Sequence, residues 1–468
     1  METSHFDLIV IGSGPAGQRA AISAAKLGRK VALIERMREL GGVCVATGTI
    51  PSKTMREAVL HFSGIRQRAF YGSSYRIKKD ITAEDIRQRM RMVMEREWSV
   101  IRNQLTRNDV EVIPGTAKFK DAHTVTIAHN ELRELSADYF VIAVGTRPYI
   151  PPYLTHDGKV VLNADSVLEI PEIPQSMVCL GAGVIGLEYA SIFAALEVEV
   201  TVVDSSKKLL KFVDQEIVES LIYQLRQSGV RFLLGDKETK VEVVEHKGKP
   251  LARTYLASGK DIGSDVVLCS SGRQANGDTL DADKAGLEVD KRGKLTVDKF
   301  YRTNVNHIYA CGDVVGFPAL ASTSMEQGRQ AALHAFDASD ASVIPDIYPF
   351  GIYTIPEIST VGATEEQCAQ KSIQYKTGIA RYHEIARGQI LGDDTGILKI
   401  IVERGTRKLL GVHSIGTGAS ELIHIGQAVI AFNGTIDYLI NAVFNYPTLA
   451  ECYKTAALDA HNRLARVD

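Results

Sequence analysis

Apolar runs in this chain end repeatedly in glycine-rich loops, and each loop precedes a segment with helical spacing. The first run, Leu8–Ile11, leads into Gly12, Gly14 and Gly17, and an alanine-rich stretch and a second apolar run ending at Glu35 follow. Short apolar runs bounded by glycine predict buried strands, and the alanine-rich stretch between them predicts a helix. The pattern therefore predicts a βαβ unit with a parallel strand pair.

The same pattern recurs in the middle of the chain. Gly181, Gly183 and Gly186 follow an apolar run, and the next apolar run ends at Asp204. A third segment, "HIYACGDVVG", predicts a strand that ends before Asp313, followed by a loop and a helix. These segments predict an α/β protein with two Rossmann-like units.

The two glycine patterns carry a specific chemistry. Glycines in the first βα turn let the backbone approach a pyrophosphate, and the helix that follows offers free N–H groups and the positive end of its dipole. Glu35, about twenty residues later, is suited to bind ribose hydroxyls. We interpret one unit as the site of FAD, with Asp313 near its ribityl chain, and the other as the site of a nicotinamide nucleotide.

Composition excludes several other classes of protein. The 468 residues are too many for one core and predict two to four domains. A formal net charge of −2 gives no support for nucleic acid as a partner, and no apolar run approaches the roughly 18 residues that span a bilayer. The six cysteines lack metal spacing, so we expect reduced thiols, no metal site and a cytoplasmic protein.

With these segments in view, the chain resembles the pyridine nucleotide–disulfide oxidoreductase family over essentially its full length. The resemblance implies a homodimer with two Rossmann-like, three-layer domains and a C-terminal α+β dimerisation domain. The expected boundaries are 1–150 and 279–344 for the two parts of the FAD domain, 151–278 for the NAD(P) domain and 345–468 for the dimerisation domain.

The chain departs from the disulfide-reducing members of that family at two places. In "GGVCVATGTIPSK", Cys44 is present, but Thr49 stands where a second cysteine is needed. In "FNYPTLAE", Tyr446 replaces the histidine before Pro447, while Glu451 remains. A phenol with a pKa of about 10 cannot shuttle protons at neutral pH as imidazole does. This combination resembles the Si-specific pyridine nucleotide transhydrogenases, which implies hydride transfer between NADPH and NAD⁺ through FAD by a ping-pong route.

The resemblance also implies roles for particular residues. Lys53 is expected near flavin N5, paired with Glu188, as the catalytic residues. The implied FAD-binding residues are Gly12, Gly14, Gly17, Glu35, Gly42, Cys44, Ala117 and Asp313. The implied NAD(P)-binding residues are Gly181, Gly183, Gly186, Asp204 and Gly272.

Two roles stay open at this stage. Cys44 either packs against the flavin or acts as a lone catalytic thiol. Asp204 is expected to serve NAD, because a carboxylate repels the 2′-phosphate of NADP. Ser205, Lys207 or Lys208 would then accommodate that phosphate, although Lys207 and Lys208 can also be read as a solvated lysine pair.

Three alternative functions share the same scaffold. The first is an NAD(P)H-dependent reductase of quinones or other small acceptors. The second is a relative of dihydrolipoamide dehydrogenase or an enzyme with one active cysteine. The third is a subunit without catalytic activity. Two intact dinucleotide patterns are hard to explain in a protein that has no turnover.

Overall fold

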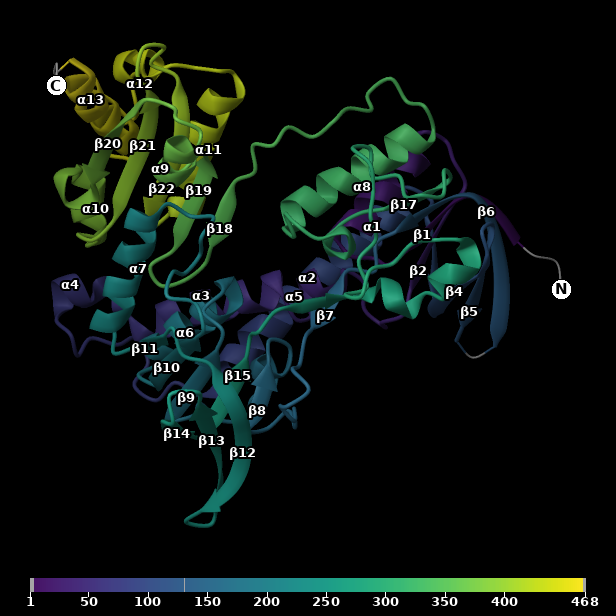
Figure 1. Cartoon of the computed structure of the whole chain (residues 1–468), viewed down its shortest axis with the longest axis horizontal. Coiled ribbons are helices and arrows are strands. Elements are labelled where there is room, and N and C mark those ends of the chain that lie inside the picture. The colour runs from purple at the N-terminus through teal and green to yellow at the C-terminus, as the bar shows by residue number, and fades with distance from the viewer. Residues whose placement is uncertain (1–3, 130, 466–468) are drawn as a thin grey trace. The chain divides into compact units, whose positions relative to one another are not determined.

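The computed structural model describes residues 4–129 and 131–465, and these separate into two compact units. Unit 1 comprises the described parts of Met1–Thr54, Arg87–Tyr149 and Gly272–Pro345. Unit 2 comprises those of Met55–Ile86, Ile150–Ser271 and Asp346–Asp468. Figure 1 identifies the elements of both units, and each unit is described by itself.

Unit 1 is built on a mixed sheet in the order β3-β2-β1-β6-β5-β4, with β17 also paired to β6. Pairs β1–β2, β1–β6, β2–β3 and β6–β17 are parallel, whereas β4–β5 and β5–β6 are antiparallel. The bounds are β1 Ser4–Ile11, β2 Val31–Glu35, β3 Glu111–Pro114, β4 Thr116–Asp121, β5 Thr124–Ala128, β6 Leu132–Ile142 and β17 Ile308–Ala310. All five residues of β2 are buried, as expected for a strand covered on both faces.

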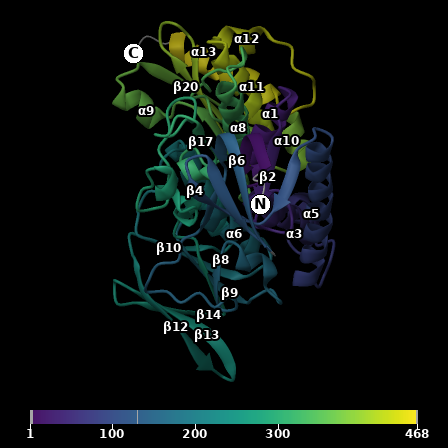
Figure 2. The same cartoon turned by 90° about the vertical axis from the view of Figure 1, so that its right-hand side faces the viewer.

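Helices α1 (Pro15–Lys26) and α8 (Ala321–Ala335) lie side by side in unit 1, as Figures 1 and 2 show. A glycine makes their close approach possible. A Cβ atom at Gly328 of α8 would lie 2.0 Å from the carbonyl oxygen of Ala16 in α1. The pair brings the start of α8 beside the glycine loop that precedes α1.

The first part of unit 2 is a parallel sheet in the order β11-β10-β9-β15-β8. Its elements are β8 Val161–Asn163, β9 Ser176–Leu180, α6 Val184–Ala195, β10 Glu199–Asp204, α7 Gln215–Gln227, β11 Arg231–Leu234 and β15 Val266–Cys269. An antiparallel sheet accompanies it, with β12 Glu238–His246, β13 Lys249–Leu256 and β14 Asp261–Ser264. Ten of the twelve residues of α6 are buried, so this helix is a core element rather than a surface one.

The second part of unit 2 is an antiparallel sheet in the order β18-β19-β22-β21-β20 with helices around it. Its strands are β18 Phe350–Ile352, β19 Ile358–Gly362, β20 Tyr375–Arg381, β21 Ile397–Glu403 and β22 Leu409–Ile415. Its helices are α9 Glu365–Gln370, α10 Ala386–Leu391, α11 Ala419–Ala431, α12 Ile436–Asn441 and α13 Glu451–Ala465. A separate apolar core, including Leu398, Val412 and Tyr453, fills this part.

The remaining elements are short or cross between the two units. They are α2 Gly42–Ala46, α3 Thr49–Ser63, α4 Arg68–Tyr71, α5 Ala83–Thr106, β7 Thr146–Pro148 and β16 Arg273–Ala275, with single turns of 3₁₀ helix at Ile65–Gln67, Ser166–Glu169, Asn276–Thr279, Ala282–Ala285, Asp313–Val315 and Tyr382–Glu384. Helices α3 and α5 each contain residues of both units. Among the residues described, no helix has both the length and the apolar character that crossing a bilayer requires.

These observations confirm the predicted fold class and both predicted βαβ units, which correspond to β1–α1–β2 and β9–α6–β10. The third predicted segment is also confirmed, because β17 is followed by a loop and then by α8. The four predicted domain boundaries stay a prediction, since unit 2 contains residues of both the nucleotide and the dimerisation parts.

Candidate functional site

The candidate site of unit 1 is a cavity of about 250 Å³ at the carboxyl ends of β1, β2 and β6. Seven predicted FAD-binding residues line it: Gly12, Gly14, Glu35, Gly42, Cys44, Ala117 and Asp313. The start of α8 also contributes, through Ala321 and Ser324. Parallel α/β sheets characteristically bind ligands at this edge of the sheet.

The three glycines of the first loop have different physical roles. A Cβ at Gly17 would lie 1.9 Å from the carbonyl oxygen of Gly12, so Gly17 permits the contact between helix and loop. A Cβ at Gly12 would lie 2.5 Å from the oxygen of Ala143 on the neighbouring strand's loop. A Cβ at Gly14 would have no protein atom within 4 Å and would enter the cavity. This open cradle beside α1 fits the pyrophosphate of a dinucleotide.

Glu35 holds the glycine loop in place. Its Oε2 accepts hydrogen bonds from the backbone N–H of Ser13 at 2.8 Å and from the Ser13 hydroxyl at 2.6 Å. Its Oε1 accepts one from the N–H of Met37 at 2.8 Å. The Ser13 hydroxyl in turn accepts the N–H of Gly41 at 2.9 Å. A single carboxylate therefore links the glycine loop, the end of β2 and the segment that leads to Cys44.

Asp313 also lines the cavity and lies three residues after the end of β17. Burial raises the pKa of its carboxyl group, whereas Arg273 and a hydrogen bond from Thr146 lower it. The Thr146 hydroxyl donates to Oδ2 of Asp313 at 3.4 Å, and Nε of Arg273 donates to that hydroxyl at 2.6 Å. Ser13, Thr146 and Arg273 were not predicted as site residues. Their only sequence signal is a polar residue beside an expected loop, which many loops share.

Cys44 lies in α2 and Thr49 begins α3. Burial raises the pKa of the Cys44 thiol, and a hydrogen bond with the Thr49 side chain partly offsets that effect. The residue in the position of the missing cysteine is thus in contact with the remaining one. The other five cysteines are all buried, and none of the six forms a disulfide.

The two predicted catalytic residues lie in different units. Lys53 is half-buried on α3 and belongs to unit 1, whereas Glu188 is buried on α6 and belongs to unit 2. Within unit 2, Oε1 of Glu188 accepts a hydrogen bond from the backbone N–H of Tyr353 at 2.9 Å. The predicted pairing of Lys53 with Glu188 stays a prediction.

The second glycine loop repeats the arrangement of the first. A Cβ at Gly186 would lie 2.0 Å from the oxygen of Gly181, while a Cβ at Gly183 would meet no protein atom within 4 Å. Asp204 accepts the N–H of Ala182 on Oδ2 at 2.6 Å and the N–H of Ser206 on Oδ1 at 2.7 Å. The Asp204 carboxylate therefore bridges two backbone positions equivalent to those that Glu35 bridges: the second residue of the glycine loop and the second residue after the carboxylate itself.

Gly272 belongs to unit 1 and not to the part that contains the second glycine loop. Its φ of +117° favours glycine, and its carbonyl oxygen accepts the N–H of Tyr149 at 3.1 Å. Its predicted role in nucleotide binding stays a prediction. Lys207 and Lys208 are both exposed in the loop that follows Asp204.

Two glycine loops of this construction, each with a carboxylate at the end of the following strand, define a protein that binds two dinucleotides. A family model described as "Pyridine nucleotide-disulphide oxidoreductase" matches residues 6–328, and the model of that family's dimerisation domain matches residues 348–457. The chain belongs to the pyridine nucleotide–disulphide oxidoreductase family. It is therefore an oxidoreductase that uses FAD and pyridine nucleotides.

The chain is similar to known proteins along nearly its whole length. "Soluble pyridine nucleotide transhydrogenase" of Mycobacterium tuberculosis strain H37Ra is 52% identical over 463 residues, which cover 98% of both chains. The protein of the same name from Photorhabdus laumondii is 42% identical, covering 99% of this chain and 100% of the relative. Among solved structures, LpdA of M. tuberculosis matches with a TM-score of 0.89 at 25% identity, over 99% of this chain and 100% of the other. The Cu(II) complex of RclA, an HOCl-induced flavoprotein disulfide reductase of Escherichia coli, gives 0.88 at 25% identity, over 98% and 99%.

Gly14→Ala and Gly17→Ala should affect different properties. We expect Gly14→Ala to fold normally but to bind FAD at least ~10-fold more weakly, because its methyl group would occupy the cradle. Gly17→Ala should instead destabilise the fold by ~1–3 kcal/mol, because its Cβ would overlap the Gly12 carbonyl. Flavin titration of the apoprotein and thermal unfolding separate the two effects. Equal flavin affinity in Gly14→Ala and the wild type would contradict the assigned cradle.

Cys44 should react slowly with iodoacetamide in the native protein. Its raised pKa leaves little thiolate at neutral pH, so alkylation should be at least ~10-fold slower than in the urea-unfolded chain and should rise through the alkaline range. Mass spectrometry of the alkylated peptide measures the rate, with Cys44→Ser as the control for the five buried thiols. Equally fast native and unfolded reactions at neutral pH would contradict the suppressed thiolate, and a faster native reaction would show an activated one.

Proposed function

We propose that the protein is an FAD-dependent NAD(P)⁺ transhydrogenase that moves a hydride between NADPH and NAD⁺ in two successive half-reactions. The observation that carries this proposal is the pair formed by Cys44 and Thr49. A dithiol cannot form there, and burial keeps the remaining sulfur a neutral thiol. The full-length similarity to proteins named as transhydrogenases supports the same function.

When bound in the cavity of unit 1, the flavin would accept a hydride from the reduced nucleotide and return it to the oxidised one. The chain's own groups bind and orient it. The N-terminal end of α1 would hold the pyrophosphate, and the start of α8, which lines the cavity, would supply N–H groups where negative charge develops on reduction. Cys44, which lines the same cavity, would pack against the ring system as a neutral thiol.

Lys53 and Glu188 are the proposed catalytic pair. A lysine ammonium near flavin N5 would stabilise the negative charge of the reduced state, and Glu188 would hold that ammonium in position. The hydrogen bond from Tyr353 fixes the carboxylate of Glu188 and supports this role, because a fixed acceptor orients its partner without further reorganisation.

Asp204 and the loop after it form the proposed basis for accepting both nucleotides. Asp204 would bind the ribose hydroxyls of NAD(H). The exposed Ser205, Lys207 and Lys208 lie within four residues of it and would meet the 2′-phosphate of NADP(H). Because the Asp204 carboxylate and the ammonium groups of Lys207 and Lys208 belong to one short stretch of chain, one loop would serve either nucleotide.

A homodimer completes the proposal. The match to the family's dimerisation domain covers residues 348–457. Among the described residues of that part, five large apolar or aromatic side chains are exposed in the single chain: Ile390 at 56%, Phe432 at 87%, Tyr438 at 60%, Val443 at 95% and Tyr446 at 69%. Burying such side chains against a second copy would remove apolar area from water. We also propose a cytoplasmic location, which agrees with six unpaired thiols.

The purified flavin-loaded protein should reduce thio-NAD⁺ with NADPH as donor. We expect fast formation of thio-NADH and slow reduction of lipoamide or an aromatic disulfide, since no dithiol is present. Cys44→Ser should retain the exchange, whereas Lys53→Met should lower its rate ~10²-fold through loss of charge stabilisation. Rapid quinone reduction with little thio-NADH would instead identify a quinone reductase on the same scaffold.

Asp204→Ala should weaken NAD(H) more than NADP(H). Loss of the carboxylate removes the ribose acceptor and also a charge that repels the 2′-phosphate, so the KM for NADH should rise ~10-fold and that for NADPH ~3-fold or less. Steady-state kinetics with each donor measures this ratio, and Lys207→Ala is the matched variant with the opposite preference. Equal losses for both nucleotides would refute the assignment.

A further inference from the structure

We propose that Lys399 and Phe350, which belong to the antiparallel sheet of unit 2, are positioning residues for the loop that selects between NAD and NADP. The selectivity loop comprises residues 205–214, between the end of β10 and the start of α7. The inference rests on the proposed function, in which this loop meets the 2′-phosphate. It adds that groups of the dimerisation part hold the loop in its working conformation.

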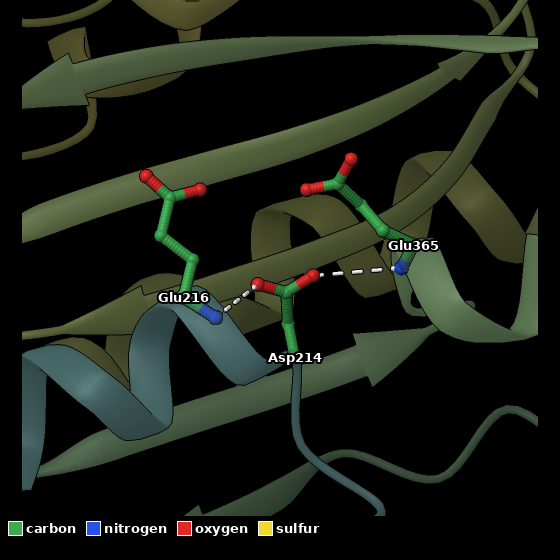
Figure 3. A group of neighbouring side chains, drawn as sticks. All are labelled: Asp214, Glu216 and Glu365. Atoms are coloured by element: carbon green, nitrogen blue, oxygen red, sulfur yellow. Dashed lines mark hydrogen bonds between the residues drawn. The ribbon is translucent and has the colours of Figure 1, made fainter.

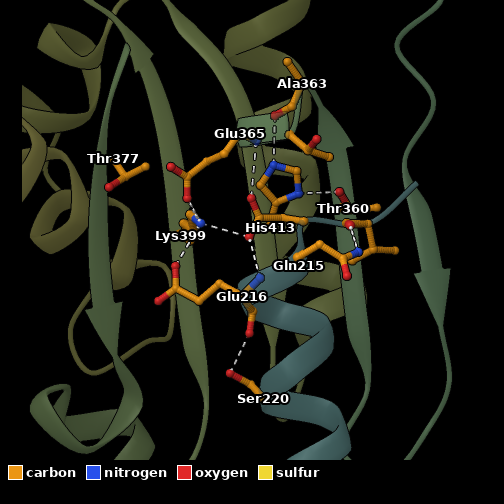
Figure 4. A network of polar contacts seen from close by, with 12 residues as sticks. Gln215, Glu216, Ser220, Thr360, Ala363, Glu365, Thr377, Lys399 and His413 are labelled. Atoms are coloured by element: carbon orange, nitrogen blue, oxygen red, sulfur yellow. Dashed lines mark hydrogen bonds and ion pairs between the residues drawn. The ribbon is translucent and has the colours of Figure 1, made fainter. Parts of the chain in front are cut away.

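Lys399 is a cation in the interior of a buried strand. Six of the seven residues of β21 are fully buried, and Lys399 itself is 1% exposed. Its Nζ lies 2.9 Å from Oδ1 of Asp214 and 2.8 Å from Oε2 of Glu216, and it also pairs with Glu365. Figure 4 shows the ammonium group between the carboxylates of Glu216 and Glu365. A buried lysine is stable in this place only because of its acidic partners.

The carboxylates of Asp214, Glu216 and Glu365 lie close enough to one another to suit a metal ion as well. Figure 3 shows Asp214 between Glu216 and Glu365, whose backbone N–H groups donate to its two oxygens at 3.2 and 3.4 Å. The Lys399 ammonium group already contacts all three carboxylates. The cluster is therefore an internal ion-pair network, in which an amino group takes the place of an added cation.

His413, the residue that faces Lys399 on the neighbouring strand, adds no second positive charge to this network. His413 faces Lys399 across the β21–β22 pair and faces Thr360 across the β19–β22 pair. Its Nε2 lies 2.9 Å from the carbonyl oxygen of Ala363, and Thr360 contacts Nδ1 at 2.5 Å. Burial lowers the pKa of His413, so the imidazole is neutral. Asp214 therefore depends on Lys399 for its charge compensation.

Asp214 is where this network meets the selectivity loop. It is the last residue of the loop and the N-cap of α7, and it is 1% exposed. Two residues earlier, the ring of Phe212 lies 5.2 Å from the ring of Phe350 on β18, measured between centroids. The last turn of the loop is thus attached to three elements of the antiparallel part: β18, β21 and α9.

The other end of the loop is fixed within the nucleotide-binding part. Asp204 accepts the N–H of Ser206, and the Ser206 hydroxyl donates to the carbonyl of Lys208 at 2.7 Å. The side chain of Lys207 lies over Gly235, where a Cβ would come within 3.0 Å of its Cγ and Cε. Between the two ends, Nε2 of Gln215 donates to the carbonyl oxygens of Leu209 and Val213. Loss of the Lys399 anchor would release the distal half of the loop, which follows Lys208 directly. Lys208 would then lose its fixed support on the C-terminal side, while Asp204 stays bound.

The test is an equilibrium titration of the oxidised holoenzyme with NADP⁺ and, separately, with NAD⁺, followed by the flavin spectrum. Lys399→Met keeps the length and apolar character of the stem but removes the charge. We expect its Kd for NADP⁺ to rise ~10-fold and that for NAD⁺ less than ~3-fold, because a misplaced phosphate partner loses most of its binding. Lys399→Arg, which keeps the charge, should bring the ratio of the Kd for NADP⁺ to the Kd for NAD⁺ most of the way back to the wild-type value. In kinetics, the change should appear in KM for NADPH rather than in kcat.

Arg253→Gln is the matched control, because it removes an exposed ion pair with Asp261 elsewhere in unit 2. It should leave both dissociation constants unchanged. A wild-type ratio of the two constants in folded, flavin-loaded Lys399→Met would overturn the inference. If Lys399→Met does not fold, Phe350→Leu and Glu365→Gln provide the test, because both leave the Lys399 ammonium group in place. A wild-type ratio of the two dissociation constants in both variants would also overturn the inference. Because the titration needs no turnover, its outcome is independent of whether the wild type exchanges hydride.

Discussion

The arrangement of the cavity in unit 1 depends on one carboxylate, that of Glu35. It binds the N–H and hydroxyl of Ser13 in the glycine loop and the N–H of Met37 after β2. Through the Ser13 hydroxyl it also reaches Gly41, which begins the segment that carries Cys44. Hydrogen bonds to an ionised acceptor contribute about 1.5–3 kcal/mol each, so this group fixes three chain segments in one geometry. Asp204 repeats the arrangement in the second βαβ unit with a shorter side chain.

The cysteine segment shows how a redox scaffold can lose one chemistry and keep another. The scaffold still brings Cys44 to the cavity, but its neighbour is a hydroxyl group rather than a thiol. Burial raises the pKa of this thiol and keeps the sulfur protonated, and a neutral thiol is a small apolar group. What remains at the cavity is the glycine loop, the starts of α1 and α8, and the carboxylate of Asp313, which suits the binding of a dinucleotide.

In unit 2, charged residues of the nucleotide part are held by the antiparallel part. Tyr353 donates its N–H to Glu188 of α6, Ile355 donates its N–H to Ser191 of the same helix, and Lys399 binds Asp214 at the start of α7. A buried charge is costly unless it is paired, so these contacts make the position of both helices depend on the antiparallel sheet. Hydrogen bonds and an ion pair, in addition to the chain itself, thus connect the two parts of unit 2.

The sequence by itself determined the two βαβ units, the glycine cradle and the replacement of the second cysteine by Thr49. These features depend on short spacings, within which backbone geometry permits few alternatives. Only the tertiary structure decided that Thr146 and Arg273 converge on Asp313, and that Lys399 meets Asp214 across 185 residues. The strand "ILKIIVE" predicts burial with one lysine inside it, but it contains no information about which carboxylates compensate the charge. Which carboxylates pair with Lys399 depends on how elements distant in the sequence pack together, and no local sequence pattern specifies that packing.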